Sequence, residues 1–213
     1  YWILTTGHSP GTTDSYTACR AVETIRQTTR LTVCGSLGML SAQSARLLIE
    51  SGMTRYHHNL ETARSHFPNI CTTHTYDEDI ETIRTAHAHG FKVCSGGIFG
   101  MGESMEQRIE MAFSLRELGV DSIPINILNP IEGTPLEHQP RLSDEEILVT
   151  IAVFRFVNPR VHLRFAGGRS LIASIQEKAL AAGVNAAIVG DYLTTLGAGV
   201  EQDKAMFQRL GRL

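Results

Sequence analysis

The sequence predicts an α/β fold: a (β/α)8 barrel of the TIM type whose first β/α unit is missing from this chain. Short apolar runs alternate strictly with segments of helical periodicity, which is typical of a parallel sheet covered by helices. The chain has 213 residues, enough for most of such a barrel, and no low-complexity linker or internal repeat divides it. We therefore expect a single domain over residues 1–213.

The alternation gives seven strand–helix units, one fewer than a complete barrel. The strands are expected near residues 1–6, 31–36, 54–59, 91–96, 121–127, 161–165 and 186–190. The helices are expected near residues 14–28, 41–51, 76–89, 104–118, 143–156, 170–182 and 201–210.

Capping residues support several of these helices. Asp14 is a candidate N-cap for the first helix, and Ser143 with Glu146 has the spacing of a capping box. Glycines follow four of the helices at the position where a left-handed backbone is common: Gly52, Gly90, Gly119 and Gly183.

Composition narrows the range of functions. The net charge is −3 and no basic tract is present, which excludes nucleic acid as an expected partner. No apolar run reaches the length of a membrane span, and no signal peptide pattern occurs. Four cysteines without a secretory signal favour a reducing, cytoplasmic compartment and metal or redox chemistry over disulfides. Because the chain begins with Tyr1 and reads as strand at once, we expect it to be cut at its N-terminus.

The most informative stretch is 91–103, in which a strand with a cysteine leads into a glycine-rich turn and a helix. The turn contains Gly96, Gly97, Gly100 and Gly102, and the absence of Cβ atoms would let a flat ligand approach the backbone. The helix that follows Glu103 would favour an anion at its first turn. A tight strand-to-helix turn without a ligand is the alternative.

Polar side chains on several strands share one parity. In a barrel, the outer strand face packs against helices and is apolar, so the polar face points into the lumen. This face carries four residues whose side chains could bind a metal or a ligand: Cys34, Cys94, Asn126 and Arg164. His57 and Asn59 are expected to join them from the third strand.

An arginine inside a barrel needs an anionic partner. Thiolates held by a metal would serve, and so would an anionic substrate; a buried polar network with a structural Arg164 is the third possibility. Cys19 differs from the other cysteines, because its helical neighbours Val22 and Ile25 indicate a core position.

Six segments resemble one family in the same order. They are Tyr-His-His-Asn-Leu-Glu-Thr (56–62), Lys-Val-Cys-Ser-Gly-Gly-Ile (92–98), Ser-Ile-Pro-Ile-Asn (122–126), Gly-Thr-Pro-Leu (133–136), Leu-Arg-Phe-Ala-Gly-Gly-Arg (163–169) and Tyr-Leu-Thr-Thr (192–195). From about residue 31 to 213 the chain resembles the biotin synthase family of radical S-adenosylmethionine (SAM) enzymes. The resemblance implies a radical SAM barrel, a sulfurtransferase that inserts sulfur between two unactivated carbons of dethiobiotin.

The resemblance also implies cofactors and site residues. A [4Fe–4S] cluster cleaves SAM, and an auxiliary cluster, usually [2Fe–2S], supplies the sulfur. Cys34, Cys94 and Arg164 match auxiliary-cluster ligands. Asn59 and Glu61 match SAM-binding positions, Asn126 matches a substrate contact, and His57 is assigned to the substrate site beside it. The pattern that packs on adenine is matched by Gly96, Ile98, Gly100 and Glu103. No catalytic side chain is assigned.

Two departures from the family pattern concern the clusters. The Cys-x3-Cys-x2-Cys motif that holds the SAM cluster is not among the 213 residues, and Trp2-Ile3-Leu4 stands where another auxiliary-cluster cysteine belongs. We hypothesise that Cys71 compensates and forms a variant cluster with Cys34 and Cys94, since thiolates are the usual ligands of iron–sulfur clusters.

The implied partners are dethiobiotin and an electron donor such as flavodoxin or ferredoxin, with a homodimer possible. Two other functions stay open: a barrel that binds an iron–sulfur cluster or small molecule without catalysis, and a metal-dependent hydrolase that uses the histidines. The histidines form no compact ligand motif, which weighs against the hydrolase.

Overall fold

A single parallel sheet organises the molecule. The computed structural model describes residues 2–5, 12–188 and 199–211. The strands are β1 (Trp2–Thr5), β2 (Val33–Ser36), β3 (Arg55–His57), β4 (Lys92–Cys94), β5 (Gly97–Phe99), β6 (Ser122–Ile127), β7 (His162–Phe165) and β8 (Ala186–Ala187). Their order is β1-β2-β3-β4-β6-β7-β8, and β5 also pairs with β6. Because each pairing is parallel, the arrangement is that of a TIM-type (β/α) fold, as predicted.

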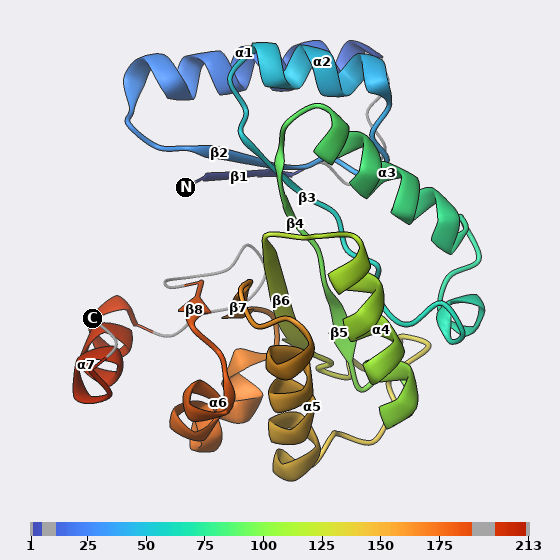
Figure 1. Cartoon of the computed structure of the whole chain (residues 1–213), viewed down its shortest axis with the longest axis vertical. Helices are drawn as coiled ribbons and strands as arrows, with labels where there is room; N and C mark the ends of the chain where they lie inside the picture. Colours follow the sequence, from blue (N-terminus) through green and yellow to red (C-terminus); the bar gives the residue numbers. More distant parts are fainter. Residues whose placement is uncertain (1, 6–11, 189–198, 212–213) are drawn as a thin grey trace.

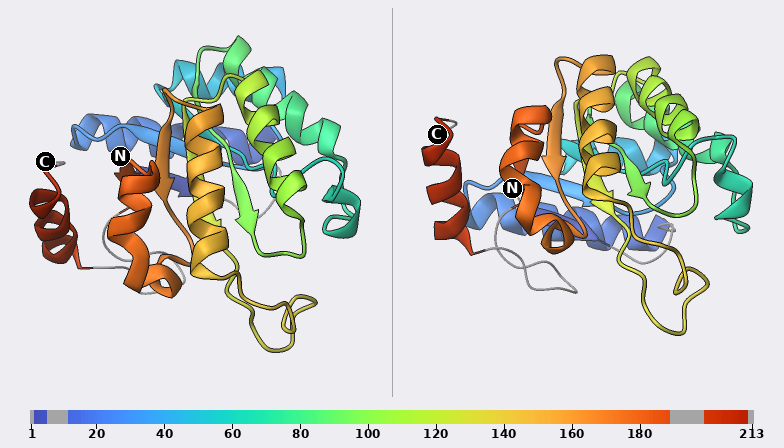
Figure 2. Two further views of the ribbon diagram at one scale, coloured as in Figure 1. Left: turned by 60° about the horizontal axis from the view of Figure 1, so that its bottom comes forward. Right: turned by 90° about the horizontal axis from the view of Figure 1, so that it is seen from below.

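Helices cover the outer side of the curved sheet (Figure 1). They are α1 (Thr12–Thr28), α2 (Ala42–Glu50), α3 (Tyr76–Ala88), α4 (Met105–Glu117), α5 (Asp144–Val157), α6 (Gln176–Ala182) and α7 (Val200–Arg209), with 3-10 helices η1 (Phe67–Asn69) and η2 (Arg169–Ile175). Helices α4, α5 and α6 stand side by side along the strands in both views of Figure 2, whereas α7 lies beyond α6.

The expected strand over 91–96 is wrong in one respect. The structure divides it into β4 and β5, since the chain bends at Ser95 and Gly96. A Cβ atom on Gly96 would overlap Pro124 of the neighbouring strand, so this bend needs glycine.

The expected helix over 170–182 is also wrong in part, because its first half is the 3-10 helix η2. The other predicted elements are present with shifted ends. Part of the last expected strand and the segment 192–195 lie outside the described residues.

The helix caps follow the sequence signals, with two exceptions. Ser143 and Glu146 form the expected capping box. Asp14 is not an N-cap, because α1 begins at Thr12 and includes it. Glycine follows α2, α3 and α4 with a positive φ, whereas Gly183 is itself the C-cap of α6.

The two faces of the sheet differ as expected. Apolar strand residues point outward and are buried against the helices, including Val33, Tyr56, Val93, Ile123 and Leu163. Residues of the opposite parity from β2, β3, β4, β6, β7 and β8 line a common cavity. The hydrophobic core therefore lies between sheet and helices, which leaves the inner face for polar side chains.

Candidate functional site

The inner face of the sheet holds a cavity of about 220 Å³ that contains two of the three thiols predicted to bind metal, Cys34 and Cys94. Its lining residues are Cys34, Arg55, Cys94, Ser122, His162, Arg164, Ala186 and Ala187. The register explains the convergence, because Cys34 pairs with Arg55, Cys94 with Ser122, and Ser122 with His162 on successive strands. The parity prediction for Cys34, Cys94 and Arg164 is thus confirmed as a placement.

Arg164 contacts one of the two thiols directly. Its Nη2 donates a hydrogen bond to Cys94 Sγ over 3.0 Å, and both residues are buried. A guanidinium at this position balances negative charge, which a thiolate would supply. The sequence argument that Arg164 requires an anionic partner stays a prediction, because Cys94 supplies negative charge only as a thiolate.

Burial keeps the thiols protonated when no metal is bound. Desolvation and the neighbouring Cys94 raise the pKa of Cys34 to about 12, although Arg164 and Arg55 oppose the shift. Desolvation also raises the pKa of Cys94, against the pull of Arg164. A metal binds thiolates, so iron would have to displace these protons, and the two arginines would favour that exchange.

These residues fit an iron–sulfur cluster in their donor chemistry. Two soft sulfur ligands and a cation face one cavity from β2, β4 and β7. Strand β1 adds no cysteine, as its sequence is Trp-Ile-Leu-Thr. The set that the described residues supply is therefore two thiols with Arg164.

Cys71 is not part of this cavity, which overturns the predicted grouping of three thiols. Among the described residues, no three His, Cys, Asp or Glu side chains are grouped so that they could hold a metal ion. The recorded side-chain contacts of Cys71 are instead with Thr73 and His74 on its own loop. Cys71 follows η1 and is not among the residues that line the cavity, whereas the hypothesis required its loop to reach the lumen.

His57 lies on the same strand face as Arg55 and is half-buried. Desolvation, followed by the charge of Arg164, lowers the pKa of His57 to about 4. Its Nδ1 atom is buried and has no recorded hydrogen-bond partner. His57 is therefore neutral at pH 7, with a ring nitrogen available to a ligand.

The loop after β3 carries the two predicted SAM-binding residues. Asn59 Oδ1 accepts a hydrogen bond from Gly96 N over 3.2 Å, and Asn59 Nδ2 lies 3.5 Å from Glu61 Oε2. Glu61 has a φ of 59°, the single positive value among the described non-glycine residues. Desolvation raises the pKa of Glu61, against the Asn59 hydrogen bond. A desolvated carboxylate on a strained backbone is typical of a ligand site.

Backbone contacts fix this loop to β5. Ile98 N donates to Glu61 O over 2.9 Å, and Leu60 N donates to Gly96 O over the same distance. A Cβ atom on Gly97 would overlap the carbonyl of Glu61, so glycine is required for the loop to approach. The glycines at 96 and 97 thus allow close packing between protein segments. The sequence instead predicted the approach of a flat ligand to these two residues.

The turn that follows is also satisfied within the protein. Glu103 accepts hydrogen bonds from Gly100 N and Met101 N, each over 2.8 Å, and pairs with Arg108 Nε over 2.8 Å. Gly100 itself has a φ of 100°, which explains a glycine there. These contacts give Glu103 a structural role and leave its assignment to adenine packing without support in the geometry.

Asn126 bridges two strand ends with its amide. Its Nδ2 donates to Gly97 O and its Oδ1 accepts from Gly167 N, both over 2.9 Å. Asn126 pairs in register with Ile98, which is half-buried. The predicted substrate contact would have to share these bonds.

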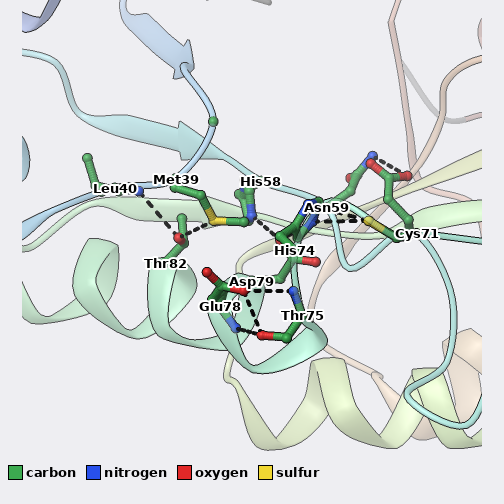
Figure 3. Close-up of polar contacts among 12 residues, drawn as sticks. Met39, Leu40, His58, Asn59, Cys71, His74, Thr75, Glu78, Asp79 and Thr82 are labelled. Carbon is green, nitrogen blue, oxygen red and sulfur yellow. Dashed lines mark hydrogen bonds and ion pairs between the residues drawn. The ribbon is translucent and has the colours of Figure 1, made fainter. Parts of the chain in front are cut away.

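A second polar cluster, not predicted as such, lies beside the loop after β3 (Figure 3). Asp79, only 1% exposed, receives His58 Nε2 at 2.7 Å and His74 Nε2 at 3.2 Å on its Oδ1 atom. Cys71 Sγ is 3.4 Å from His74 Nδ1. In the sequence, Asp79 reads as an ordinary acidic residue in the first turn of α3, so no signal distinguishes it.

Sequence reasoning also missed Arg55 in the cavity. The available signal was parity, because Arg55 lies two residues before His57 on one strand and must share its face.

None of the helices described is long and apolar enough to cross a bilayer.

Two family models match the chain. The Radical SAM superfamily matches residues 1–115, and the Biotin and Thiamin Synthesis associated domain matches residues 124–212. The two matched regions contribute strands to the same sheet.

Several relatives are similar along nearly the whole chain. A biotin synthase of Clostridium botulinum (strain Hall) is 51% identical over 209 residues, which is 98% of this chain and 66% of that protein. A biotin synthase of Acetivibrio thermocellus is 50% identical, with 98% and 65% covered. The chain thus spans slightly less than two thirds of the length of these relatives.

Solved structures agree on the fold. A methylornithine synthase superposes with a TM-score of 0.78 at 21% identity, over 98% of this chain and 66% of that one. The [FeFe]-hydrogenase maturase from Carboxydothermus hydrogenoformans gives a TM-score of 0.76 at 13% identity, over 97% and 54%.

Proposed function

The chain belongs to the Radical SAM superfamily, and from this premise we propose that it carries the substrate and sulfur-donor part of a biotin synthase that converts dethiobiotin to biotin. The similarity to biotin synthases at about half of all positions supports this proposal. The single structural observation that carries it is the inner cavity, in which Cys34, Cys94 and Arg164 converge from three strands.

In the proposed reaction, SAM with its [4Fe–4S] cluster supplies the radical chemistry, and an auxiliary iron–sulfur cluster supplies the sulfur. Cys34 and Cys94 would hold the auxiliary cluster as thiolates. Arg164, 3.0 Å from Cys94 Sγ, would balance their charge and complete the ligand set.

The loop after β3 would bind SAM. Asn59 and Glu61 present an amide and a carboxylate, which suit the hydroxyls of a ribose. Glu61 is desolvated, so hydroxyl donors would relieve the cost of its buried charge. Ile98, half-buried on β5, offers an apolar surface for the adenine ring.

Dethiobiotin would lie between SAM and the sulfur donor. His57 is neutral and has a free acceptor or donor nitrogen, so it can hydrogen-bond an uncharged urea group. Asn126 would orient the substrate while it keeps β5 and the turn after β7 together. No side chain of this chain is assigned as a general acid or base.

The remaining features complete the proposal. An electron donor such as flavodoxin or ferredoxin would reduce the SAM cluster, whose ligands are not among these 213 residues. The enzyme would act as a homodimer in the cytoplasm, where thiols stay reduced.

Anaerobic reconstitution with iron and sulfide tests the proposal. We expect bound iron and sulfide with visible absorbance, together with SAM binding in equilibrium dialysis that Asn59→Ala and Glu61→Gln weaken. Because the ligands of the SAM cluster are not among these 213 residues, biotin is assayed with the chain joined to a segment that carries the Cys-x3-Cys-x2-Cys motif, by mass spectrometry after addition of SAM, dethiobiotin and reduced flavodoxin. Binding of a cluster and SAM without formation of biotin would indicate a non-catalytic barrel. Bound zinc in place of iron would indicate a hydrolase. Either result contradicts the proposed function.

A further inference from the structure

The second polar cluster joins a thiol, two imidazoles and a carboxylate in one line of contacts (Figure 3). Cys71 Sγ lies 3.4 Å from His74 Nδ1, and His74 Nε2 lies 3.2 Å from Asp79 Oδ1. A carboxylate only accepts hydrogen bonds from its partners, so a neutral His74 with its proton on Nε2 faces Asp79, and its Nδ1 atom is an acceptor between the thiol and the Thr73 hydroxyl, which lies 3.0 Å away. This is the order of nucleophile, base and orienting carboxylate that activates a thiol.

Asp79 is suited to the orienting role. It is almost fully buried, and its Oδ2 atom has no recorded hydrogen-bond partner. His58 Nε2 donates to the same Oδ1 atom over 2.7 Å, which fixes the carboxylate in place. A buried carboxylate with spare accepting capacity stabilises positive charge on His74 when that ring takes the proton of the thiol.

The contacts of Cys71 favour its thiolate form. Desolvation raises the pKa of Cys71, and the charge of Asp79 adds to this. Hydrogen bonds from the Thr73 side chain and from the backbone of Thr73 and His74 together outweigh both effects, so that the pKa of Cys71 lies below its ordinary value. Once Nδ1 of His74 carries the proton of the thiol, the Thr73 hydroxyl, 3.0 Å from Nδ1 and 3.5 Å from Sγ, is able to donate to the anion. The other three cysteines are buried, whereas Cys71 is partly exposed and open to a reagent.

We propose that Cys71 is a nucleophilic thiol, activated by His74 and Asp79, that takes up sulfane sulfur from a persulfide or polysulfide. The thiolate is a soft nucleophile, and Cys71 packs partly against the hydrophobic core, which admits a small and weakly hydrated reagent. The supply role rests on the proposed function, because sulfur insertion consumes one sulfur atom for each biotin formed.

The transfer balances without a further oxidant or reductant. The Cys71 sulfur forms a bond to the outer sulfur of the donor R–S–SH while the S–S bond of the donor breaks. The donor leaves as R–S⁻ and takes the proton held on His74, giving R–SH. The protein keeps the group Cys71–S–SH, so the sulfane sulfur is conserved.

Alkylation of the chain without clusters or SAM tests the activated thiol. The rate of iodoacetamide modification at Cys71 is followed by peptide mass spectrometry across pH, in the native chain and in the chain unfolded in urea. We expect the native rate at pH 7 to be about tenfold higher, since an ordinary thiol is ionised to only a few per cent there. His74→Gln and Asp79→Asn should remove the gain, whereas His138→Gln, at an exposed side chain, should not.

Inorganic polysulfide tests the ligand class. We expect a mass increase of one sulfur atom on the peptide that contains Cys71, absent in Cys71→Ser and reversed by dithiothreitol. Equal native and unfolded alkylation rates, or no effect of His74→Gln, would overturn the activation. Rapid alkylation without a polysulfide adduct would overturn sulfane sulfur as the ligand. Neither measurement involves iron, SAM or dethiobiotin. If only the proposed function fails, the alkylation and polysulfide results stay as expected while no biotin is formed.

Discussion

The inner cavity and the turn around Glu103 differ in whether their buried polar groups have partners within the protein. In the turn, both oxygens of Glu103 are bonded to backbone N–H groups, and Arg108 neutralises their charge. In the cavity, two thiols are held protonated by burial, and the Nδ1 atom of His57 has no recorded partner. A buried polar group that the protein satisfies stabilises the fold, whereas one that it leaves under-satisfied is available to a ligand.

Removal of Cys94 gives the largest expected effect on the cavity. Cys94→Ala should abolish the visible absorbance that appears after anaerobic reconstitution with iron and sulfide, since one of the two thiol ligands is lost. SAM binding should be largely unchanged. Cys19→Ala is the matched control, because Cys19 is a buried thiol of α1 in the hydrophobic core and does not line the cavity. Full absorbance in Cys94→Ala would show that the cavity does not hold the cluster.

Breaking the pair in the turn should cost stability instead of ligand binding. Glu103→Ala leaves Arg108 buried without its carboxylate, so we expect the free energy of unfolding to fall by about 3 kcal/mol. Urea denaturation measures this. Glu106→Ala, at an exposed position in the first turn of α4, should change the stability by no more than about 0.5 kcal/mol. A stable Glu103→Ala with weakened SAM affinity would instead assign Glu103 to the cofactor.

Acid should destabilise the cavity through His57. The pKa of His57 is lowered to about 4 in the folded chain, below the ordinary 6.5. The unfolded state therefore binds more protons between these values, and stability falls as the pH drops from 6.5 towards 4, by at most roughly 3 kcal/mol. Denaturation of the wild type and of His57→Asn at several pH values measures the difference. An equal slope in both proteins would contradict the assignment.

Replacement of Arg164 should have the smallest effect on folding. Arg164→Met fills similar volume without charge, and with neutral thiols around it we expect the free energy of unfolding to change by less than about 1 kcal/mol. Reconstituted absorbance should weaken, because the charge of the thiolates is no longer balanced. Arg116→Met, on an exposed part of α4, is the control. Loss of folding in Arg164→Met alone would give Arg164 a structural role.

Much of the fold can be predicted from the sequence, because strand parity and helix caps depend on neighbouring residues in the chain. The alternation of Leu163 and Phe165 with His162 and Arg164 is enough to assign faces. The bend at Gly96 could not be foreseen in this way, since it depends on Pro124 of another strand. The resemblance supplied the roles, but it did not reveal that Glu103 folds back onto its own turn.

The site was less predictable where contacts arise between loops. Cys71 and His74 are three residues apart, and the loop conformation alone determines whether the thiol turns to the lumen or to the imidazole. Asp79 gains its importance only because α3 places it beneath His58 and His74. Such convergence across the chain has no local signature.

Position 61 combines a left-handed backbone with a carboxylate, and no amino acid provides both without strain. Glycine would adopt a φ of 59° without the penalty of about 1 kcal/mol that a side chain incurs there, yet glycine has no carboxylate. Selection for heat resistance alone would therefore favour Gly at 61 and remove the carboxylate to which we assign SAM binding. Engineering of a more robust variant should hold this residue constant and seek its gains on the helices.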